Sequence, residues 1–401
     1  MITTKNNEHK KLNVPNLRFP EFQGEWEKCK LSEICTFFSG GTPSSSNKDF
    51  YGGNIAFIRS GELHADSTEL FITQAGFDSS SAKMVEIGDL LLAMYGATSG
   101  DIAVSKIKGA INQAILCIRT KQNKIFIESV WNKHVSKNLK KYLQGGQGNL
   151  SADIVKGISF FFPTLKEQEK IANIVSLLDE RIATQNKVID RLQSLIKGLN
   201  DSLYAQYGGK VLTSFAELGT SYSGLSGKSA QDFGSGKPFI TYLNVYSNNV
   251  INENEFQYVA IKDDEKQNVA EYGDVLFTLS SETPREVGIG SVYLGKEKVY
   301  LNSFCFGIHI TNTKVAFSPY LSYYVSSTPF RKFVYPYAQG STRFNLCKAD
   351  FEKASIKLPT LENQKRIYSI LSHIDSKIET EIQMLNLYNS QKQYLLRQMF
   401  I

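Results

Sequence analysis

The sequence predicts an α+β protein that is arranged as an internal pseudo-twofold repeat. We expect two mixed α/β domains with curved or barrel-like sheets, separated by two long helices that pair as an antiparallel coiled coil. Three observations in the 401-residue chain predict this fold: a duplicated sequence, two long heptad patterns, and short strand-like runs between them. A composition of 42% apolar and 21% charged residues is that of a globular protein, which excludes a disordered or collagen-like chain.

The duplication is clearest in residues 163–204, which align without a gap with residues 359–400. The two copies share 12 identities in 42 positions, including the pair Gln168 and Gln364. The repeat divides the chain into five segments: an N-terminal arm (1–24), a first domain (25–162), a first helix (163–207), a second domain (208–358) and a second helix (359–401).

The two helical segments carry a sustained heptad pattern. Apolar residues recur in steps of three and four from Ile171 to Leu203 and again from Ile367 to Met399. This 3.5-residue spacing is typical of a coiled-coil seam. Both seams become polar at one equivalent position, which favours a single register. The seam or partner-contacting residues that we expect are Leu178, Ile182, Gln185, Ile189, Leu192, Ile374, Ile378, Glu381, Leu385 and Tyr388.

The segments between the helices are rich in aromatic, β-branched, Gly and Ser residues. Runs such as residues 55–59, 89–94 and 115–119 are typical of strands between turns. The pattern of residues 126–143 predicts one amphipathic helix, with a counterpart at residues 319–335.

Residue patterns for catalysis or metal binding are weak. The five cysteines form no Cys-x-x-Cys pair, and the histidines lack zinc-binding spacing, so neither a disulfide framework nor a metal site is expected. Gly227-Lys228-Ser229 lacks the first glycine of a P-loop. The Glu/Lys clusters at residues 167–170 and 350–353 could imitate a nuclease site, but charge is common at helix starts. The polar N-terminus and short apolar runs predict a cytoplasmic protein without a membrane span.

The basic residues are unevenly distributed. Residues 102–152 hold nine Lys/Arg and one acid, and the equivalent residues 298–349 hold six Lys/Arg and no acid. The remaining chain has 30 basic and 38 acidic residues, so the net charge of +6 comes from these two windows. Two matched windows with one acid and none favour a polyanion-binding surface over a solvated face. Both windows end in a Gly-rich loop, at residues 144–149 and 339–345, where Gln, Asn, Ser and Arg can contact base edges. The candidate DNA-binding residues are Arg59, Lys106, Lys108, Arg119, Lys133, Lys137, Lys140, Lys141, Gln144, Gln147, Asn149, Lys298, Lys314, Arg331, Lys332, Gln339, Ser341, Thr342, Arg343 and Lys348.

Several motifs in order resemble the specificity subunits of type I restriction-modification enzymes over nearly the whole chain. They are Ser39-Gly-Gly-Thr-Pro-Ser44, Tyr51-Gly-Gly-Asn-Ile-Ala-Phe-Ile58, Gly88-Asp-Leu-Leu-Leu-Ala-Met-Tyr-Gly-Ala-Thr98, Ala110-Ile-Asn-Gln113, Gly148-Asn-Leu-Ser151 and the two Pro-Thr-Leu helix starts. The second domain departs from the pattern, because residues 280–285 stand where a copy of Tyr95-Gly-Ala-Thr98 is expected.

The resemblance implies two target-recognition domains, each reading one half of a bipartite, asymmetric double-stranded DNA sequence, with the paired helices setting the spacer. It implies that the helices dock two modification (methyltransferase) subunits, and that restriction (translocase/nuclease) subunits join the complex. S-adenosylmethionine, ATP and Mg²⁺ are then expected in those partner subunits, with no cofactor or catalytic residue in this one. Two alternatives remain open: a coiled-coil adaptor that binds only protein, and a stand-alone nuclease.

Overall fold

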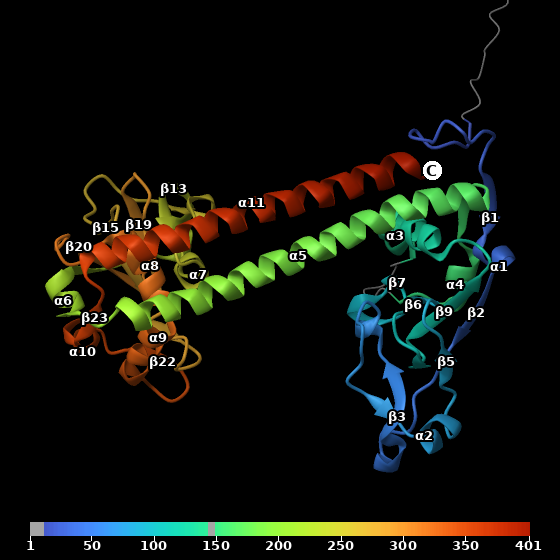
Figure 1. The fold of residues 1–401 in the computed structure, drawn as a ribbon, viewed down its shortest axis with the longest axis horizontal. Coiled ribbons are helices and arrows are strands. Elements are labelled where there is room, and N and C mark those ends of the chain that lie inside the picture. Colours follow the sequence, from blue (N-terminus) through green and yellow to red (C-terminus); the bar gives the residue numbers. More distant parts are fainter. Residues whose placement is uncertain (1–11, 143–148) are drawn as a thin grey trace, which may run out of the picture. The chain divides into compact units, whose positions relative to one another are not determined.

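A computed structural model describes the backbone of residues 12–142 and 149–401 and the side chains of residues 12–134 and 149–401. The chain packs as two compact units (Figure 1). Unit 1 is Met1–Asn186 with Gln383–Ile401, and unit 2 is Lys187–Ile382. Each long helix therefore contributes one end to each unit.

Unit 1 contains two four-stranded sheets and a two-stranded ribbon. Its strands are β1 (Glu27–Lys30), β2 (Cys35–Ser39), β3 (Tyr51–Ile58), β4 (Phe71–Ile72), β5 (Lys83–Val85), β6 (Leu90–Ala93), β7 (Ile102–Val104), β8 (Gly109–Ile111), β9 (Ile115–Thr120) and β10 (Ser159–Phe162). Its short helices are α1 (Leu31–Ile34), α2 (Gln74–Asp78), α3 (Lys124–Tyr142) and α4 (Ala152–Gly157). The sheet orders are β2-β9-β6-β7 and β4-β3-β8-β5, and β1 pairs with β10.

Unit 2 repeats this topology. Its strands are β11 (Val211–Thr213), β12 (Gly219–Ser223), β13 (Phe233–Ile240), β14 (Gln257–Val259), β15 (Val269–Ala270), β16 (Val275–Thr278), β17 (Ser280–Ser281), β18 (Gly290–Val292), β19 (Val299–Leu301), β20 (Cys305–Ile310), β21 (Ala338–Gln339), β22 (Phe344–Leu346) and β23 (Ile356–Leu358). Its short helices are α6 (Phe215–Leu218), α7 (Tyr242–Ser247), α8 (Ser318–Ser326), α9 (Thr328–Val334) and α10 (Lys348–Lys353).

The strand orders show that the two units are copies of one fold. In unit 2 the sheets are β12-β20-β16-β18 and β14-β13-β19-β15, and β11 pairs with β23. The single parallel pair is also shared, as β3 with β8 in unit 1 and β13 with β19 in unit 2. A third sheet, β17-β22-β21, is present in unit 2. The predicted mixed α/β domains and the internal repeat are confirmed.

No closed barrel is formed, since the strand orders of the described sheets are open. One detail of the prediction was wrong. The counterpart of α3 is not one helix but two, α8 and α9. The chain breaks at Ser327, which has extended backbone and whose hydroxyl accepts the N–H of Phe330 at 3.3 Å. Pro329, in the first turn of α9, favours such a break because proline is compatible with a helix start but not with a helix interior.

Each core joins the sheet to the ends of both long helices, α5 (Leu165–Tyr207) and α11 (Leu361–Met399). In unit 1, Trp131 and Phe126 pack in one cluster with Ile171 of α5 and Met399 of α11. In unit 2, a cluster of stacked aromatic rings contains Leu203 of α5 together with Ile367 and Leu371 of α11. Burial of these apolar faces holds each long helix onto the domains at both of its ends.

The heptad prediction agrees with the burial pattern of both long helices. Every predicted seam position from Ile171 to Leu203 and from Ile367 to Met399 is buried or half-buried. In unit 1, Lys392 of α11 forms an ion pair with Asp179 of α5 at 2.5 Å. In unit 2, the Arg366 guanidinium of α11 lies over the Tyr207 ring of α5 at 5.5 Å. The helices are thus paired antiparallel within each unit.

The described part of the N-terminal arm forms hydrogen bonds with the start of α5 and the end of α11. The Arg18 guanidinium donates to both oxygens of Glu167 at 2.8 Å, and Glu167 is 1% exposed. The Leu17 N–H donates to the carbonyl of Gln398 near the end of α11 at 2.9 Å. The arm therefore fastens the start of α5 and the end of α11 in unit 1.

Candidate nucleic-acid interface

Four of the five candidate cations of unit 1 whose side chains are described are paired with carboxylates from outside the acid-poor window. Lys106 pairs with Asp66 at 2.8 Å and Lys108 with Glu86 at 3.1 Å. Arg119 forms an ion pair with Asp89 at 2.7 Å. The hydrogen bond to Asp89 is the main cause that raises the pKa of the Arg119 guanidinium. Arg59 is held by Glu62 at 2.7 Å, with Glu69 at 3.6 Å. In the folded structure, carboxylates from other parts of the chain therefore lie next to the basic residues of this window.

The last candidates of unit 1 lie around the end of α3. Lys133 donates to the carbonyl of Phe400 at 2.5 Å, and burial lowers the pKa of its ammonium. Asn149 is exposed. Five further candidates lie outside the described residues: the side chains of Lys137, Lys140 and Lys141, and the loop residues Gln144 and Gln147.

In unit 2 several candidates are also engaged. Lys298 pairs with Glu271 at 2.5 Å, and Lys348 pairs with Glu352 at 3.6 Å and lies over the Phe306 ring. Lys314 is exposed. Arg331 donates to the backbone carbonyls of Arg285, Val287 and Gly288 at 2.5–2.8 Å, and burial lowers its pKa. Arg331 therefore fixes the segment between β17 and β18.

Four further candidates of unit 2 lie on one turn, and two of them line a groove. The β21–β22 turn carries Gln339, Ser341, Thr342 and Arg343, all exposed. Gly340 in this turn has φ +141°, and a Cβ there would lie 2.1 Å from the Arg343 carbonyl oxygen, so only glycine fits the turn. Thr342 and Arg343 line a groove of 840 Å³.

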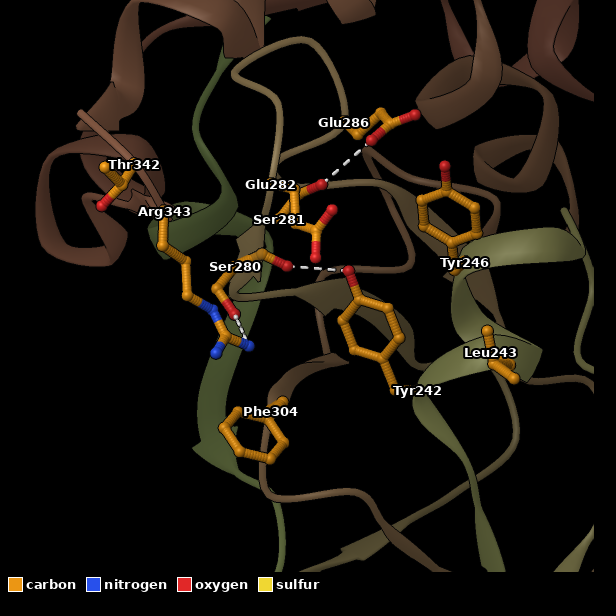
Figure 2. A pocket seen from close by; sticks show the side chains of 10 residues that line it. All are labelled: Tyr242, Leu243, Tyr246, Ser280, Ser281, Glu282, Glu286, Phe304, Thr342 and Arg343. Carbon is orange, nitrogen blue, oxygen red and sulfur yellow. Dashed lines mark hydrogen bonds between the residues drawn. The ribbon is translucent and has the colours of Figure 1, made fainter. Parts of the chain in front are cut away.

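The other walls of this groove are aromatic and acidic (Figure 2). They come from α7, the β17 region and the residue before β20; besides Thr342 and Arg343, the lining residues are Tyr242, Leu243, Tyr246, Ser280, Ser281, Glu282, Glu286 and Phe304. The Phe304 side chain is 55% exposed, so its ring is accessible from the groove. The Tyr242 and Tyr246 rings are stacked, with centroids 6.0 Å apart.

Arg343 is oriented by two contacts across the groove. Its guanidinium lies over the Phe304 ring at 5.7 Å, and its Nη2 donates to the Ser280 hydroxyl at 3.4 Å. The Tyr242 hydroxyl donates to the Ser280 carbonyl at 2.7 Å, so Ser280 stands between the two side chains (Figure 2). In the part of the chain that the structure describes, Arg343 has no carboxylate within ion-pair distance.

A second hollow of 640 Å³ is lined by Arg285, which follows the groove residues Ser280–Glu282 in the sequence. It is lined by Lys197, Arg285, Ser326, Thr328, Arg331, Lys332 and Tyr335. Among the described residues, Lys197, Arg285 and Lys332 have no carboxylate partner, so three unneutralised cations surround one concavity that also carries hydroxyl groups. This is the chemistry that contacts phosphate.

The sequence indicated Arg343, Thr342 and Lys332 but not Tyr242, Tyr246, Phe304, Glu282, Arg285 or Lys197. One signal pointed to this place: residues 280–285 depart from the first copy, and this segment contributes lining residues to both the groove and the basic hollow. In unit 1 the equivalent loop ends at Leu150, whose N–H donates to the Met94 carbonyl at 2.8 Å as Leu346 does to Leu279. Residues 143–148 of that loop lie outside the described part of the chain.

The described residues contain no group of three or more His, Cys, Asp or Glu side chains arranged to hold a metal ion. Among the helices described, none has the length and apolar character needed to span a bilayer.

Comparison with known proteins gives a consistent result. Residues 23–194 and 220–387 each match the type I restriction modification DNA specificity domain. The chain is 26% identical over 415 residues to the putative type I restriction enzyme MjaX specificity subunit of Methanocaldococcus jannaschii, covering 92% of both chains. It is also 26% identical over 175 residues to the EcoR124I/EcoR124II specificity subunit of Escherichia coli, covering 41% of this chain and 43% of that one.

Solved structures share the fold. The S subunit of the type I restriction-modification system from M. genitalium superposes with a TM-score of 0.58 at 13% identity, over 97% of this chain and 99% of that chain. A chain from a structural study of complex assembly and conformational transition in the type I R-M system gives 0.58 at 17% identity, over 92% and 96%. Since both family matches together cover most of the sequence, this chain belongs to the type I restriction-modification DNA specificity family.

Proposed function

We propose that this chain is the DNA-reading subunit of a type I restriction-modification complex, in which each unit reads one half of a bipartite, asymmetric target. The observation that carries the proposal is that the two units share one strand order but differ in the loops at equivalent places. Two copies of one scaffold with different loops suit a target made of two different half-sites.

In this proposal the chain itself catalyses no reaction. The modification subunits supply S-adenosylmethionine-dependent methylation, and the restriction subunits supply ATP- and Mg²⁺-dependent translocation and cleavage. The chain binds double-stranded DNA, positions two modification subunits, and sets the distance between the half-sites. Helix α5, with 43 residues, is about 65 Å long at ~1.5 Å per residue.

The docking surface proposed for the modification subunit in unit 1 is the outer face of the paired helices. Leu177 of α5 and Leu387 and Tyr394 of α11 are 61%, 65% and 56% exposed, although apolar positions on such helices are normally covered. Replacing Leu387 and Tyr394 by Glu should abolish co-purification with the modification subunit. The exposed polar exchange Gln383→Glu on the same helix should leave co-purification intact; loss in both variants would contradict the assignment.

The experiment that tests the function is base-resolved methylation mapping of DNA exposed to the chain with its modification subunits. We expect one motif with two constant halves and an unspecified spacer. Methylation without any motif would exclude sequence reading. An adaptor predicts that the chain alone shows no duplex affinity, and a nuclease predicts Mg²⁺-dependent cleavage by the chain alone.

A further inference from the structure

We propose that the groove of unit 2 reads one G·C base pair, with Arg343 donating to guanine and Glu282 accepting from cytosine. This rests on the proposed DNA-reading function and names the residues and the base pair through which unit 2 performs it. Figure 2 shows both side chains lining the same groove.

The Arg343 guanidinium is oriented without being neutralised. Its contact with the Phe304 ring holds the group at the groove, and Ser280 uses one of its five N–H donors. The turn that presents it is fixed by Gly340. A rigid, charged fork with free donors is the side chain that binds guanine O6 and N7 together.

The other polar groups of the groove are mostly occupied. The Tyr242 hydroxyl is bound to the Ser280 carbonyl. The Glu286 carboxylate accepts hydrogen bonds from Thr283, Tyr246 and Ser281, which hold its pKa below the ordinary value. Glu282 is exposed and, in the described part of the chain, has no hydrogen-bond or ion-pair partner. The groups left to meet a ligand are therefore the Arg343 donors, the Glu282 acceptor and the Thr342 hydroxyl.

This set of donors and acceptors matches one base pair. In the major groove a G·C pair presents two acceptors on guanine and then the N4 amino donor on cytosine. A fork of donors beside a carboxylate is complementary to that order. An A·T pair instead presents an acceptor, a donor, an acceptor and a methyl group. Either an Arg343 donor would then face the adenine N6 donor, or the Glu282 acceptor would face the thymine O4 acceptor.

A phosphate contact is the competing role for Arg343. The basic hollow provides Lys197, Arg285 and Lys332 for that purpose, and neither Arg343 nor Glu282 lines it. A phosphate site would gain nothing from an unpaired carboxylate such as Glu282 in its wall, because two anions repel each other. The groove and the hollow are therefore assigned to base reading and backbone contact respectively.

The test maps methylation by the complex of this chain with its modification subunits, using a DNA library randomised over both half-sites. Exchanging residues 25–155 first identifies which half unit 2 reads, because that half should not change. The wild-type complex should require a G·C pair at one position of that half. Arg343→Ala should reduce the preference for this pair from about ten-fold or more to near equality, with the other half unchanged. Glu282→Gln should relax the same position.

Two variants serve as controls. Arg285→Ala should slow methylation at all sequences alike, because it acts on the backbone, and the exposed Lys262→Ala should leave the motif unchanged. The proposal is overturned if the half read by unit 2 contains only A·T pairs, or if Arg343→Ala lowers methylation uniformly without changing the motif. A wild-type complex without any motif would instead refute the DNA-reading function itself. Because Arg343 and Glu282 are exposed, unchanged thermal unfolding of both variants separates these outcomes from misfolding.

Discussion

Gln364 in unit 2 and Gln168 in unit 1 each accept one backbone N–H and donate to the carbonyl of the proline at the helix start. The Gln364 Oε1 accepts the N–H of Phe317 at 2.8 Å, and its Nε2 donates to the carbonyls of Val315 and Pro359. The Gln168 Oε1 accepts the N–H of Asn123 at 3.1 Å, and its Nε2 donates to the Pro163 carbonyl and to Gln122. In both copies a buried amide joins the first turn of a long helix to the segment that follows the last strand of the first sheet.

Replacing Gln168 by Ala should destabilise unit 1. The substitution leaves the half-buried Asn123 N–H and Pro163 carbonyl without this partner, which costs about 1–3 kcal/mol. Tryptophan fluorescence during urea unfolding is a suitable measurement, because both tryptophans of the chain, Trp26 and Trp131, are buried in unit 1. The exposed Gln383→Ala on α11 is the control; equal midpoints for the two variants would contradict the role of Gln168.

Glu128 should make stability depend on pH near neutrality. It lines a cavity of 470 Å³ with Asp179 and Lys392, and burial followed by the Asp179 charge raises its pKa to about 7, while His64 and Lys392 oppose the rise. Because the folded state holds this proton more tightly than the unfolded state, the contribution is full below about pH 4.5 and is lost as pH rises through about 7.

Glu128→Gln should remove this dependence. Relative to the wild type, the variant should become more stable with rising pH, by up to about 3 kcal/mol at pH 8. Urea unfolding at pH 5 and pH 8 measures the difference, with the exposed Glu180→Gln as the matched control. A constant difference between Glu128→Gln and wild type across this range would refute the assignment.

Removing Arg285 and Lys332 together should weaken binding to all DNA sequences. Each lost phosphate contact should reduce the slope of log affinity against log salt by about 1, so the double variant should lose about 2. Fluorescence anisotropy with labelled duplex over a range of salt concentrations gives the slope. Lys262→Ala/Lys296→Ala removes the same charge from exposed positions outside the hollow and should keep the original slope.

Lengthening both long helices by one heptad should lengthen the spacer of the target. Seven residues inserted after 186 in α5 and after 382 in α11 preserve the seam pattern and add about 10.5 Å, or roughly three base pairs. Methylation mapping should find both half-sites unchanged and the spacer longer. An unchanged spacer would show that the helices do not set the distance.

The sequence was sufficient for features that repeat with a regular period. The seam from Ile171 to Leu203 is periodic, and each of its positions is buried or half-buried. Equivalent residues such as Gln168 and Gln364 identified the duplication because the same contacts require the same side chain. The break at Ser327 was missed because a proline two residues later is compatible with either a helix start or a kink.

The interface was harder to predict because it depends on residues distant in the chain. Lys106 lies in a window with a single acid, Glu128, yet Asp66 from outside the window pairs with it in the folded structure. Conversely, Lys197 belongs to the heptad helix but lies in one hollow with Arg285. Charge counted along the sequence indicates which part of the chain is basic, but only the folded arrangement decides which cations remain unpaired.

The measurement that tests the central claim most directly is the exchange of residues 25–155 for the equivalent segment of another family member, followed by methylation mapping of the complex with its modification subunits. If each unit reads its own half-site, one half of the motif should change while the other half and the spacer stay as they were. A change in both halves, or an unchanged motif, would contradict independent reading by the two units.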